Sequence, residues 1–330
     1  MVIPSLNEES YIGAVIDAIR RDPLAHRLLI VVVDGGSADG TCEVVSKLAA
    51  EAGNIRLIAN PLRIQSAGVN RAAKLFGAGR RWLIRMDAHA DYPEGYISDL
   101  VAEAERTGAS SVVVAMAAKG RSCFQRAAAA AQNSVLGAGG SAHRSRGRDG
   151  FVDHGHHALF DMEKFLLLGG YDESQSHNED AEFDVRLARS GGRIWLTRKT
   201  SVGYYPRSSP AGLYLQYRNY GRGRAATILR HRMRPKLRQA LPAALAPAIL
   251  LAAFAPWIAL VALPAALWLC GCLAYGVVLG VCERNRCACA AWLAAAIMHI
   301  AWSVGFWSAL GGHAAASLRA HRAPLPARAP

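Results

Sequence analysis

The chain has 330 residues, enough for one large domain or two smaller ones, and a formal net charge of +13 at pH 7. It contains no Asp, Glu, Lys or Arg from residue 240 to 282 or from 287 to 318. Buried core helices rarely run so long without a charge. The two tracts therefore argue against an ordinary water-soluble protein and predict membrane-spanning helices, which need about 20 apolar residues each.

The positive charge is concentrated just before the first apolar tract. Residues 218–238 carry eight Arg and Lys side chains and no acid. Nucleic-acid-binding surfaces have a similar composition. A position beside a membrane segment instead favours a cytoplasmic flank that is attracted to anionic lipid. We therefore expect a membrane as partner and no nucleic acid.

The seven cysteines do not form the pattern of a disulfide framework. Cys42 and Cys123 are isolated, and the other five lie in or beside the apolar tracts without a C-x-x-C pair. We expect most of them to be small apolar side chains in helix or lipid contacts. No signal peptide precedes the polar part of the chain, so we expect that part in the cytoplasm.

The first ninety residues alternate between strands and helices. Apolar runs predict strands at residues 1–3, 28–33, 55–59 and 82–86, and the segments between them predict helices at 10–21, 42–52 and 65–76. This alternation predicts an α/β fold with a parallel, doubly wound sheet. Such sheets bind ligands at the carboxyl ends of their strands, so the residues that follow each strand are candidate site residues.

Asp34 ends the second predicted strand and is followed by two glycines. Glycines allow a tight turn with positive φ and let a base or a phosphate approach the backbone. Asp34 then has the chemistry to accept hydrogen bonds from a base or a ribose. The alternative is purely structural, with Ser37 or Asp39 capping the next helix. The motif is not a dinucleotide fingerprint, because it lacks G-x-G-x-x-G.

Asp87, His89 and Asp91 follow the fourth predicted strand at alternate positions. In an extended backbone this spacing directs oxygen and nitrogen ligands toward one cation. A polar turn after a strand has the same composition, since Asp is common in turns. The residues alone leave a metal site and a turn as equal alternatives.

A second acidic cluster begins at Glu179 and Asp180 and opens a helix that is expected to end at Gly191. Acids in a first helical turn are stabilised by the helix dipole, which is the structural interpretation. The functional interpretation is that one of these carboxylates is a general base. Glu182 and Arg186 have the spacing of an i, i+4 ion pair.

The segment between the two acidic clusters is less informative. Residues 127–140 are rich in Ala and Gly and predict either a mobile loop or a flexible connection, and Arg144, Arg146 and Arg148 follow. Three histidines without a clear fourth ligand are weak grounds for zinc. The role of these histidines stays open, with the acceptor site as one candidate; they are His154, His156 and His157.

The apolar tracts predict spans at residues 241–260, 263–281 and 288–310. Four prolines, at positions 242, 247, 256 and 264, are expected to kink or bound these helices. Basic residues before 241 and at 284 and 286 indicate cytoplasmic flanks. The side of the membrane on which the C-terminus lies stays open.

Several of these motifs together resemble a known family. Residues 4–8, 32–41 and 87–89 resemble the nucleotide-sugar domain of family 2 glycosyltransferases. With residues 60–70 and 92–93, they are similar to the succinoglycan-type exopolysaccharide glucosyltransferases that bacteria anchor in the inner membrane. The resemblance runs from Val2 to about Arg224.

The resemblance implies a GT-A-like nucleotide-sugar-binding domain with a mostly parallel sheet, followed by C-terminal transmembrane helices. It divides the chain into a glycosyltransferase domain (1–215), a basic juxtamembrane segment (216–239), transmembrane helices (240–312) and a tail (313–330). Within the first domain, residues 1–95 would form the nucleotide-sugar half and 96–215 the acceptor half.

The resemblance also implies roles for particular residues. On the donor side, Asp34 would contact the uracil, and Pro4, Glu8, Arg63 and Asp87 would bind the nucleotide sugar. Asp87 and His89 match the family's metal-and-diphosphate motif, which is more often Asp-x-Asp, and would hold Mg²⁺ or Mn²⁺. The histidine departs from that pattern but suits manganese.

On the acceptor side, Asp180 resembles the family's general base, with Glu179 as its neighbour. Tyr220, Arg222 and Arg224 belong to a Tyr-Gly-Arg-Gly-Arg sequence that would bind a diphosphate of the donor or of a lipid, since guanidinium binds phosphate well. The Q-x-x-R-W motif of processive family members is absent.

The expected function is that of an inverting, metal-dependent transferase. It would move a hexose, with glucose the first candidate, from a UDP-sugar to a polyprenyl-diphosphate-linked oligosaccharide in exopolysaccharide biosynthesis. We expect a multi-pass protein of the bacterial inner membrane with a cytoplasmic catalytic domain and partners in an assembly complex. The alternatives are a processive polysaccharide synthase and a non-catalytic scaffold that binds nucleotide sugars.

Overall fold

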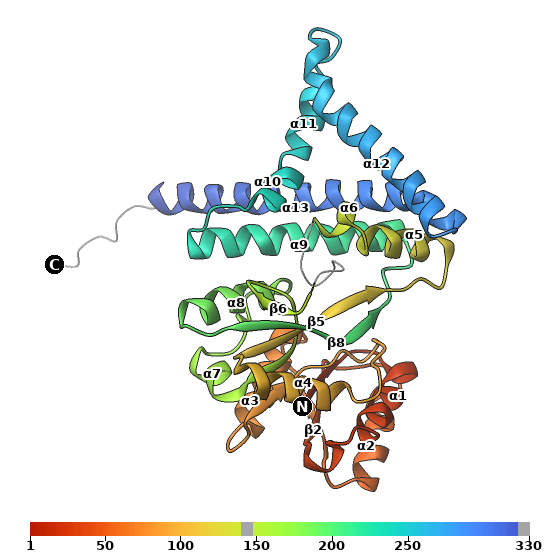
Figure 1. The fold of residues 1–330 in the computed structure, drawn as a ribbon. Helices are drawn as coiled ribbons and strands as arrows, with labels where there is room; N and C mark the ends of the chain where they lie inside the picture. Colours follow the sequence, from red (N-terminus) through yellow and green to blue (C-terminus); the bar gives the residue numbers. More distant parts are fainter. Residues whose placement is uncertain (140–147, 323–330) are drawn as a thin grey trace, which may run out of the picture.

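The computed structural model describes residues 1–139 and 148–322. An α/β domain forms one layer, and helices from the C-terminal third form a second layer across its top (Figure 1). Arg144 and Arg146 lie outside the described residues, as do the last eight residues of the predicted tail.

The first half of the domain is a parallel sheet. Strand β2 (Ile30–Asp34) pairs with β1 (Val2–Ser5) on one side and with β3 (Ile55–Ala59) on the other, both in parallel. The crossover helices are α1 (Glu9–Arg20), α2 (Thr41–Glu51) and α3 (Gln65–Phe76). The predicted strands and helices of this half are confirmed to within a few residues.

The second half adds a mixed sheet beside the first. Its strand order is β4-β7-β5-β8-β6, and only the β5–β8 pair is parallel. A parallel bridge between Val2 and Arg85 joins the end of β4 to β1. The strands are β4 (Trp82–Ile84), β5 (Ser111–Ala118), β6 (Gly150–Val152), β7 (His156–Asp161) and β8 (Ile194–Tyr204). The helices are α4 (Tyr96–Thr107), α5 (Cys123–Gln132), α6 (Val135–Ala138), α7 (Met162–Leu167) and α8 (Glu179–Arg189).

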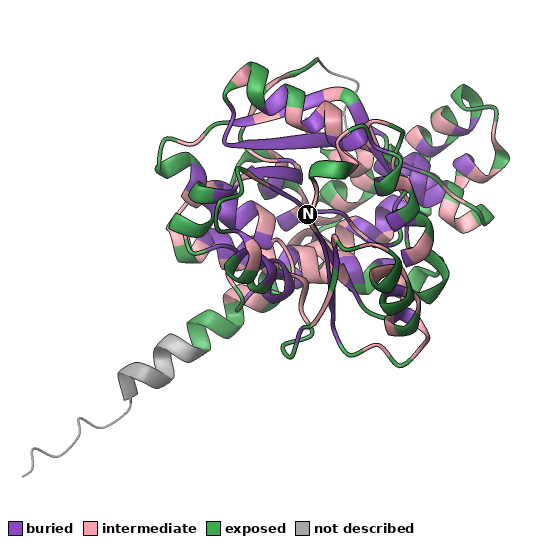
Figure 2. Ribbon diagram, turned by 90° about the horizontal axis from the view of Figure 1, so that it is seen from below, coloured by how far each residue is buried: buried purple, intermediate pink, exposed green. Residues whose placement is uncertain are grey.

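Two apolar clusters, one on each face of the sheet, form the core. Val32 packs with Ile12 and Ile16 of α1, whereas Val31 and Val33 face the opposite cluster around Phe160. Because successive strand side chains point to opposite faces, a strand covered on both sides must be apolar throughout. The buried colour of the central strands in Figure 2 reflects this arrangement.

The C-terminal third contains two helical segments long and apolar enough to cross a membrane, at residues 259–282 and 286–315. The helices of this third are α9 (Pro210–His231), α10 (Leu237–Ala243), α11 (Leu245–Ala252), α12 (Leu263–Cys282) and α13 (Ala291–Arg322). The expectation of one span at 241–260 is wrong, because this segment is divided into α10, α11 and a turn. Prolines 242, 247 and 256 cannot donate backbone hydrogen bonds, which favours these breaks.

Helix α13 lies along α9 on top of the domain (Figure 1). The two backbones approach closely at a reciprocal pair of glycines. A Cβ at Gly305 would lie 1.9 Å from the carbonyl oxygen of Arg218, and one at Gly221 would lie 2.0 Å from that of Trp302. Small residues at a helix crossing allow such contact between backbones. The glycine pair therefore fixes the long helix against the domain.

Two expectations for the middle of the chain are wrong. Residues 127–131 are not a mobile loop or connection, because they form a buried row of alanines in α5 that packs on α13. Cys123 is not isolated, since it forms a disulfide with Cys287. The two cysteines are 164 residues apart in sequence, so no local spacing signalled the pair.

We predict that Gly305→Ala lowers the stability of the protein by about 2 kcal/mol, because a methyl group would overlap the backbone of α9. Gly311→Ala in the same helix is the matched control, since a Cβ there has no neighbour within 4 Å. Alanine favours a helix over glycine by about 1 kcal/mol, so this control should not destabilise. Thermal unfolding of the detergent-solubilised protein measures both, and equal melting temperatures would contradict the close crossing.

Candidate active site

One cleft of 1880 Å³ lies between the strand ends of the sheet, α8 and the C-terminal helices. It collects most of the residues that the sequence singled out: Pro4, Glu8, Arg63, Asp87, His89, Glu179, Asp180, Tyr220 and Arg224. Asp34 and Arg222 are not among its lining residues. The two acidic clusters, ninety residues apart in sequence, thus face the same space.

Asp34 lies just behind the cleft wall, which its neighbours Val33 and Gly35 line. Its carboxylate accepts hydrogen bonds from the backbone N–H groups of Gly36, at 2.8 Å, and Ser37, at 2.9 Å. Burial acts to raise the pKa of Asp34, but the hydrogen bonds from Ser37 and Gly36 outweigh it and lower the pKa below its usual value. The carboxylate therefore holds the turn that follows β2 in a fixed shape.

Asp87 and His89 lie on the floor of the cleft with defined partners. Gln65 Nε2 donates to Asp87 Oδ1 at 2.8 Å, and His89 Nδ1 lies 2.7 Å from Glu8 Oε1. Burial would raise the pKa of Asp87, but Arg85 and nearby histidines lower it overall. The hydrogen bond to Glu8 raises the pKa of His89.

Arg85 connects the two acidic clusters and was not singled out from the sequence. Its guanidinium lies 3.4 Å from Asp87 and 3.6 Å from Glu179, and its side chain is only 7% exposed. The available signal was a lone arginine in the apolar strand sequence Leu83-Ile84-Arg85-Met86. A charge at such a position is expected only with a buried partner.

Glu179 and Asp180 begin α8 and differ in environment. Burial, with the adjacent charge of Asp180, raises the pKa of Glu179 to about 7, although Arg85 opposes this shift. Asp180 faces Arg224 across the cleft, and burial lowers the pKa of that arginine in spite of Asp180. The site thus holds one carboxyl group whose pKa is near 7, that of Glu179, and a second one, that of Asp180, opposite a guanidinium.

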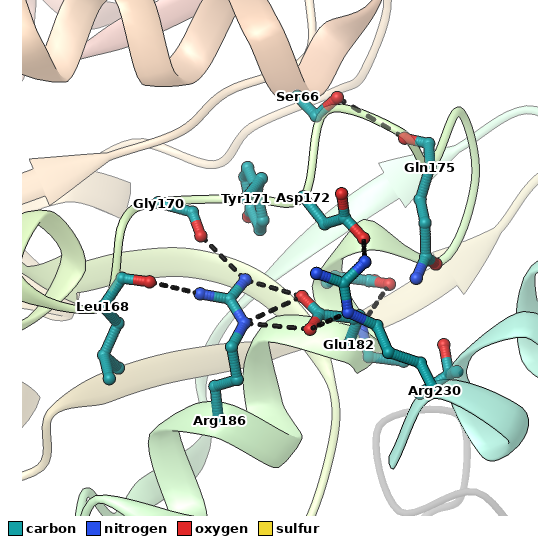
Figure 3. A network of polar contacts seen from close by, with 12 residues as sticks. Ser66, Leu168, Gly170, Tyr171, Asp172, Gln175, Glu182, Arg186 and Arg230 are labelled. Carbon is teal, nitrogen blue, oxygen red and sulfur yellow. Dashed lines mark hydrogen bonds and ion pairs between the residues drawn. The ribbon is translucent and has the colours of Figure 1, made fainter. Parts of the chain in front are cut away.

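A buried ion pair fixes the start of α8 (Figure 3). Arg186 Nη2 lies 2.6 Å from Glu182 Oε2, which confirms the pair expected from their spacing. The same guanidinium donates to the carbonyl oxygens of Leu168, at 2.5 Å, and Gly170, at 2.8 Å. The turn before Tyr171 is thereby bound to the helix that carries the acids.

The end of α9 joins this network. His231 Nε2 lies 2.9 Å from Glu182 Oε1, and Arg230 forms an ion pair with Asp172 (Figure 3). Glu182 is fully buried, so it needs these partners. Part of the basic run at 218–238 is therefore used inside the domain rather than against lipid.

His154 and His156, which follow β6, lie next to carboxylates of different segments. His154 Nδ1 lies 2.7 Å from Asp184 of α8, and His156 Nε2 lies 4.0 Å from Asp87. The side chain of His157 lies outside the described residues. Within those residues, three or more His, Cys, Asp or Glu side chains are nowhere grouped to hold a metal ion on their own.

Asp91 lies away from the cleft. Its carboxylate accepts a hydrogen bond from Tyr205 at 2.9 Å and pairs with Lys119 at 3.1 Å. The spacing of Asp87, His89 and Asp91 suggested three ligands on one side, but the backbone turns after His89. Asp91 therefore stabilises the junction with β8.

Residues 1–167 match the family model described as glycosyl transferase family 2. The chain is 51% identical over 312 residues to the succinoglycan biosynthesis protein ExoA of Rhizobium meliloti (strain 1021), covering 94% of each protein. The structure of the mannosyltransferase PcManGT from Pyrobaculum calidifontis, in complex with GDP-Man and Mn²⁺, matches with a TM-score of 0.60 and 20% identity, covering 91% of this chain and 86% of that one. S. aureus TarS 1-349 in complex with UDP matches at a TM-score of 0.46 and 17% identity, covering 77% and 71%.

The family match and the likeness to PcManGT confirm the expected GT-A-like architecture. The parallel sheet of the first half and the apolar C-terminal helices both agree with it. The similarity to ExoA extends into the C-terminal helices, because it covers 94% of the chain.

We predict that Arg186→Met destabilises the protein by about 3 kcal/mol, because it removes a partner of the buried Glu182. Arg20→Met is the matched control, since Arg20 pairs with Asp17 only at 3.9 Å on the exposed side of α1. Exposed pairs contribute less than about 1 kcal/mol. Urea unfolding of the solubilised protein compares the two, and equal midpoints would show that the Glu182 network is not needed for stability.

Proposed function

Because the chain belongs to glycosyl transferase family 2, we propose that it transfers a hexose, glucose being the first candidate, from a UDP-sugar to a polyprenyl-diphosphate-linked oligosaccharide with inversion. The observation that carries the proposal is the single cleft in which Arg85 joins Asp87 of the nucleotide half to Glu179 of the acceptor half. The 51% identity of the chain to a succinoglycan biosynthesis protein supports a role in exopolysaccharide synthesis.

The donor would bind over the carboxyl ends of β1 and β2. Pro4, Glu8 and Arg63 line this part of the cleft, and the turn held by Asp34 forms its edge. The Arg63 guanidinium lies beside Gly36, so a side chain at Gly36 would crowd it. We assign Asp34 to the uracil side through this turn and Arg63 to the ribose or the diphosphate.

Asp87 and His89 have the chemistry to hold a divalent cation. The lowered pKa of Asp87 keeps its carboxylate ionised at neutral pH. Glu8 engages Nδ1 of His89, which is how metal-binding histidines are usually oriented, and this leaves Nε2 as the ligand atom. With only two protein ligands, the diphosphate and water would complete the coordination. A bound Mg²⁺ or Mn²⁺ would neutralise the negative charge that develops on the leaving diphosphate.

Asp180 is the proposed general base. An inverting transfer needs a carboxylate that accepts the proton of the acceptor hydroxyl as this oxygen attacks the sugar. Glu179 has a different task, because its raised pKa and its contact with Arg85 favour a positioning role. Two adjacent carboxyls with different environments can thus take separate roles.

The acceptor would approach from the side of α9. Tyr220 and Arg224 line the cleft opposite the donor half, and Arg222 lies on the exposed face of the same helix. We assign the acceptor diphosphate to Arg224, with Arg222 attracting it from outside. The domain would work at the cytoplasmic face of the inner membrane, beside other enzymes of exopolysaccharide assembly.

We predict that Asp180→Asn lowers the rate of transfer by about 10³-fold, the usual contribution of a general base, while UDP-sugar binding persists. Asp99→Asn, in the first turn of α4 and outside the cleft, is the matched control and should leave transfer unchanged. Radiolabelled transfer in membranes and UDP-sugar binding by the purified protein measure the two effects. Full transfer by Asp180→Asn would support a non-catalytic role for this carboxylate.

We also predict that EDTA abolishes transfer and that Mn²⁺ restores it at lower concentration than Mg²⁺, because imidazole suits manganese. Asp87→Ala should lower both the affinity for the metal and the rate of transfer by at least about tenfold. His89→Asp creates an all-oxygen pair and should shift the preference toward Mg²⁺. Unchanged activity in EDTA would refute the metal assignment, and an unchanged metal preference in His89→Asp would remove His89 from it.

A further inference from the structure

The cleft does not end at the catalytic carboxylates. The same cleft is also lined by residues of the C-terminal helices, most of which are apolar. This apolar branch is formed by residues of α11, α12 and α13, among them Leu245, Ala248, Trp268, Gly271, Met298 and Trp302. One continuous space thus has a polar end at the acids and an apolar end among helices long enough to cross a membrane.

The wall of the apolar branch is a built structure. Trp268 Nε1 donates to Nδ1 of His299 at 3.1 Å, and Nε2 of His299 lies 2.7 Å from the carbonyl oxygen of Leu136. These two hydrogen bonds connect α12 to α13 and α13 to α6. Because the polar atoms of Trp268 and His299 bond to one another or to backbone, these two side chains leave an apolar surface to a ligand.

Positive charge lies where the polar and apolar parts of the cleft meet. Arg224 and Arg238 both line the cleft there, and Arg238 has Asp153 at 3.5 Å. Within the described residues, the side chain of Arg224 has no hydrogen bond and no ion pair, although Asp180 and Asp184 act on it electrostatically. A guanidinium in this position suits a phosphate group. The sequence of charges along the cleft is therefore carboxylate, guanidinium and then apolar surface.

The outer surface of the same helices is apolar as well. Leu250, Phe254, Trp257, Leu260 and Leu267 are exposed around the junction of α11 with α12. In Figure 1 these two helices rise from α13 and meet at a tip above the domain. A ligand with a long apolar chain can therefore pass from the cleft to surroundings that are apolar too.

We propose that the apolar branch binds the first isoprene units of the acceptor's polyprenyl chain, with the diphosphate at Arg224 and Arg238 and the sugar at Asp180. This inference rests on the proposed function and adds a site for the lipid to it. Along its length, the ligand carries a sugar hydroxyl, a diphosphate and an apolar chain. In the same order, the cleft offers a carboxylate, two guanidinium groups and an apolar wall.

Plugging the branch tests the proposal. A Cβ at Gly271 has no neighbour within 4 Å, so Gly271→Leu would fill the branch without a clash, and Ala248→Phe would fill it from α11. Ala274→Leu is the matched control, because Ala274 is exposed on α12 and outside the cleft. The probe is a polyprenyl diphosphate with a diazirine on its chain, photolysed with the full-length protein in nanodiscs.

We expect labelling of peptides from α11 and α12 that is competed by unlabelled polyprenyl diphosphate. Labelling should fall about tenfold in Gly271→Leu and Ala248→Phe, since about two buried CH₂ groups of contact are lost, and stay unchanged in Ala274→Leu. UDP-sugar binding should be the same in all variants. That measurement separates the two proposals, because a wrong donor assignment would abolish UDP-sugar binding even in the parent protein.

Other results would overturn the inference. Full competition by phosphatidylglycerol vesicles would show that the branch holds bulk phospholipid instead. Equal labelling of the plugged variants and the parent protein would show that the chain lies outside the branch.

Discussion

The guanidinium of Arg85 lies buried between two carboxylates that come from different halves of the domain. A charge in this position is costly unless it is paired, and removing one partner of a buried pair destabilises a protein by about 3–5 kcal/mol. Its Nε atom has no hydrogen-bond partner among residues 1–139 and 148–322, so the position is not optimised for stability alone. Arg85 is best understood as the group that keeps Asp87 and Glu179 at one site although both carry or can carry negative charge.

The position of Glu179 depends in turn on the network around Glu182. Arg186 binds both this carboxylate and the turn before Tyr171, and His231 brings in the end of α9. Helix α8 is therefore attached to α9, the helix on which α13 lies. A shift of the C-terminal helices would be transmitted to the acids through buried ionic contacts, which tolerate little change in geometry.

The C-terminal helices line part of the cleft. The glycine pair at the crossing of α9 and α13 brings apolar helices directly onto the α/β domain, and the disulfide of Cys123 with Cys287 joins the domain to these helices. As a result, the cleft is shared between a polar domain and an apolar helical layer. This arrangement suits the proposed reaction between a water-soluble donor and a membrane-bound acceptor.

The sequence by itself determined the first half of the fold and the identity of the acids. The apolar runs that end in Asp34 and Asp87 predicted where the strands lie and end. Hydrophobic periodicity and the residue preferences of turns are local properties, so they can be read from the sequence. The tertiary structure alone decided which groups meet. Arg85 with Glu179, Cys123 with Cys287 and the buried alanines of α5 are all contacts between segments far apart in sequence, which no spacing encodes. The division of the 241–260 segment into short helices likewise depended on proline positions and on packing against α13, since the apolar composition alone fits one straight span equally well.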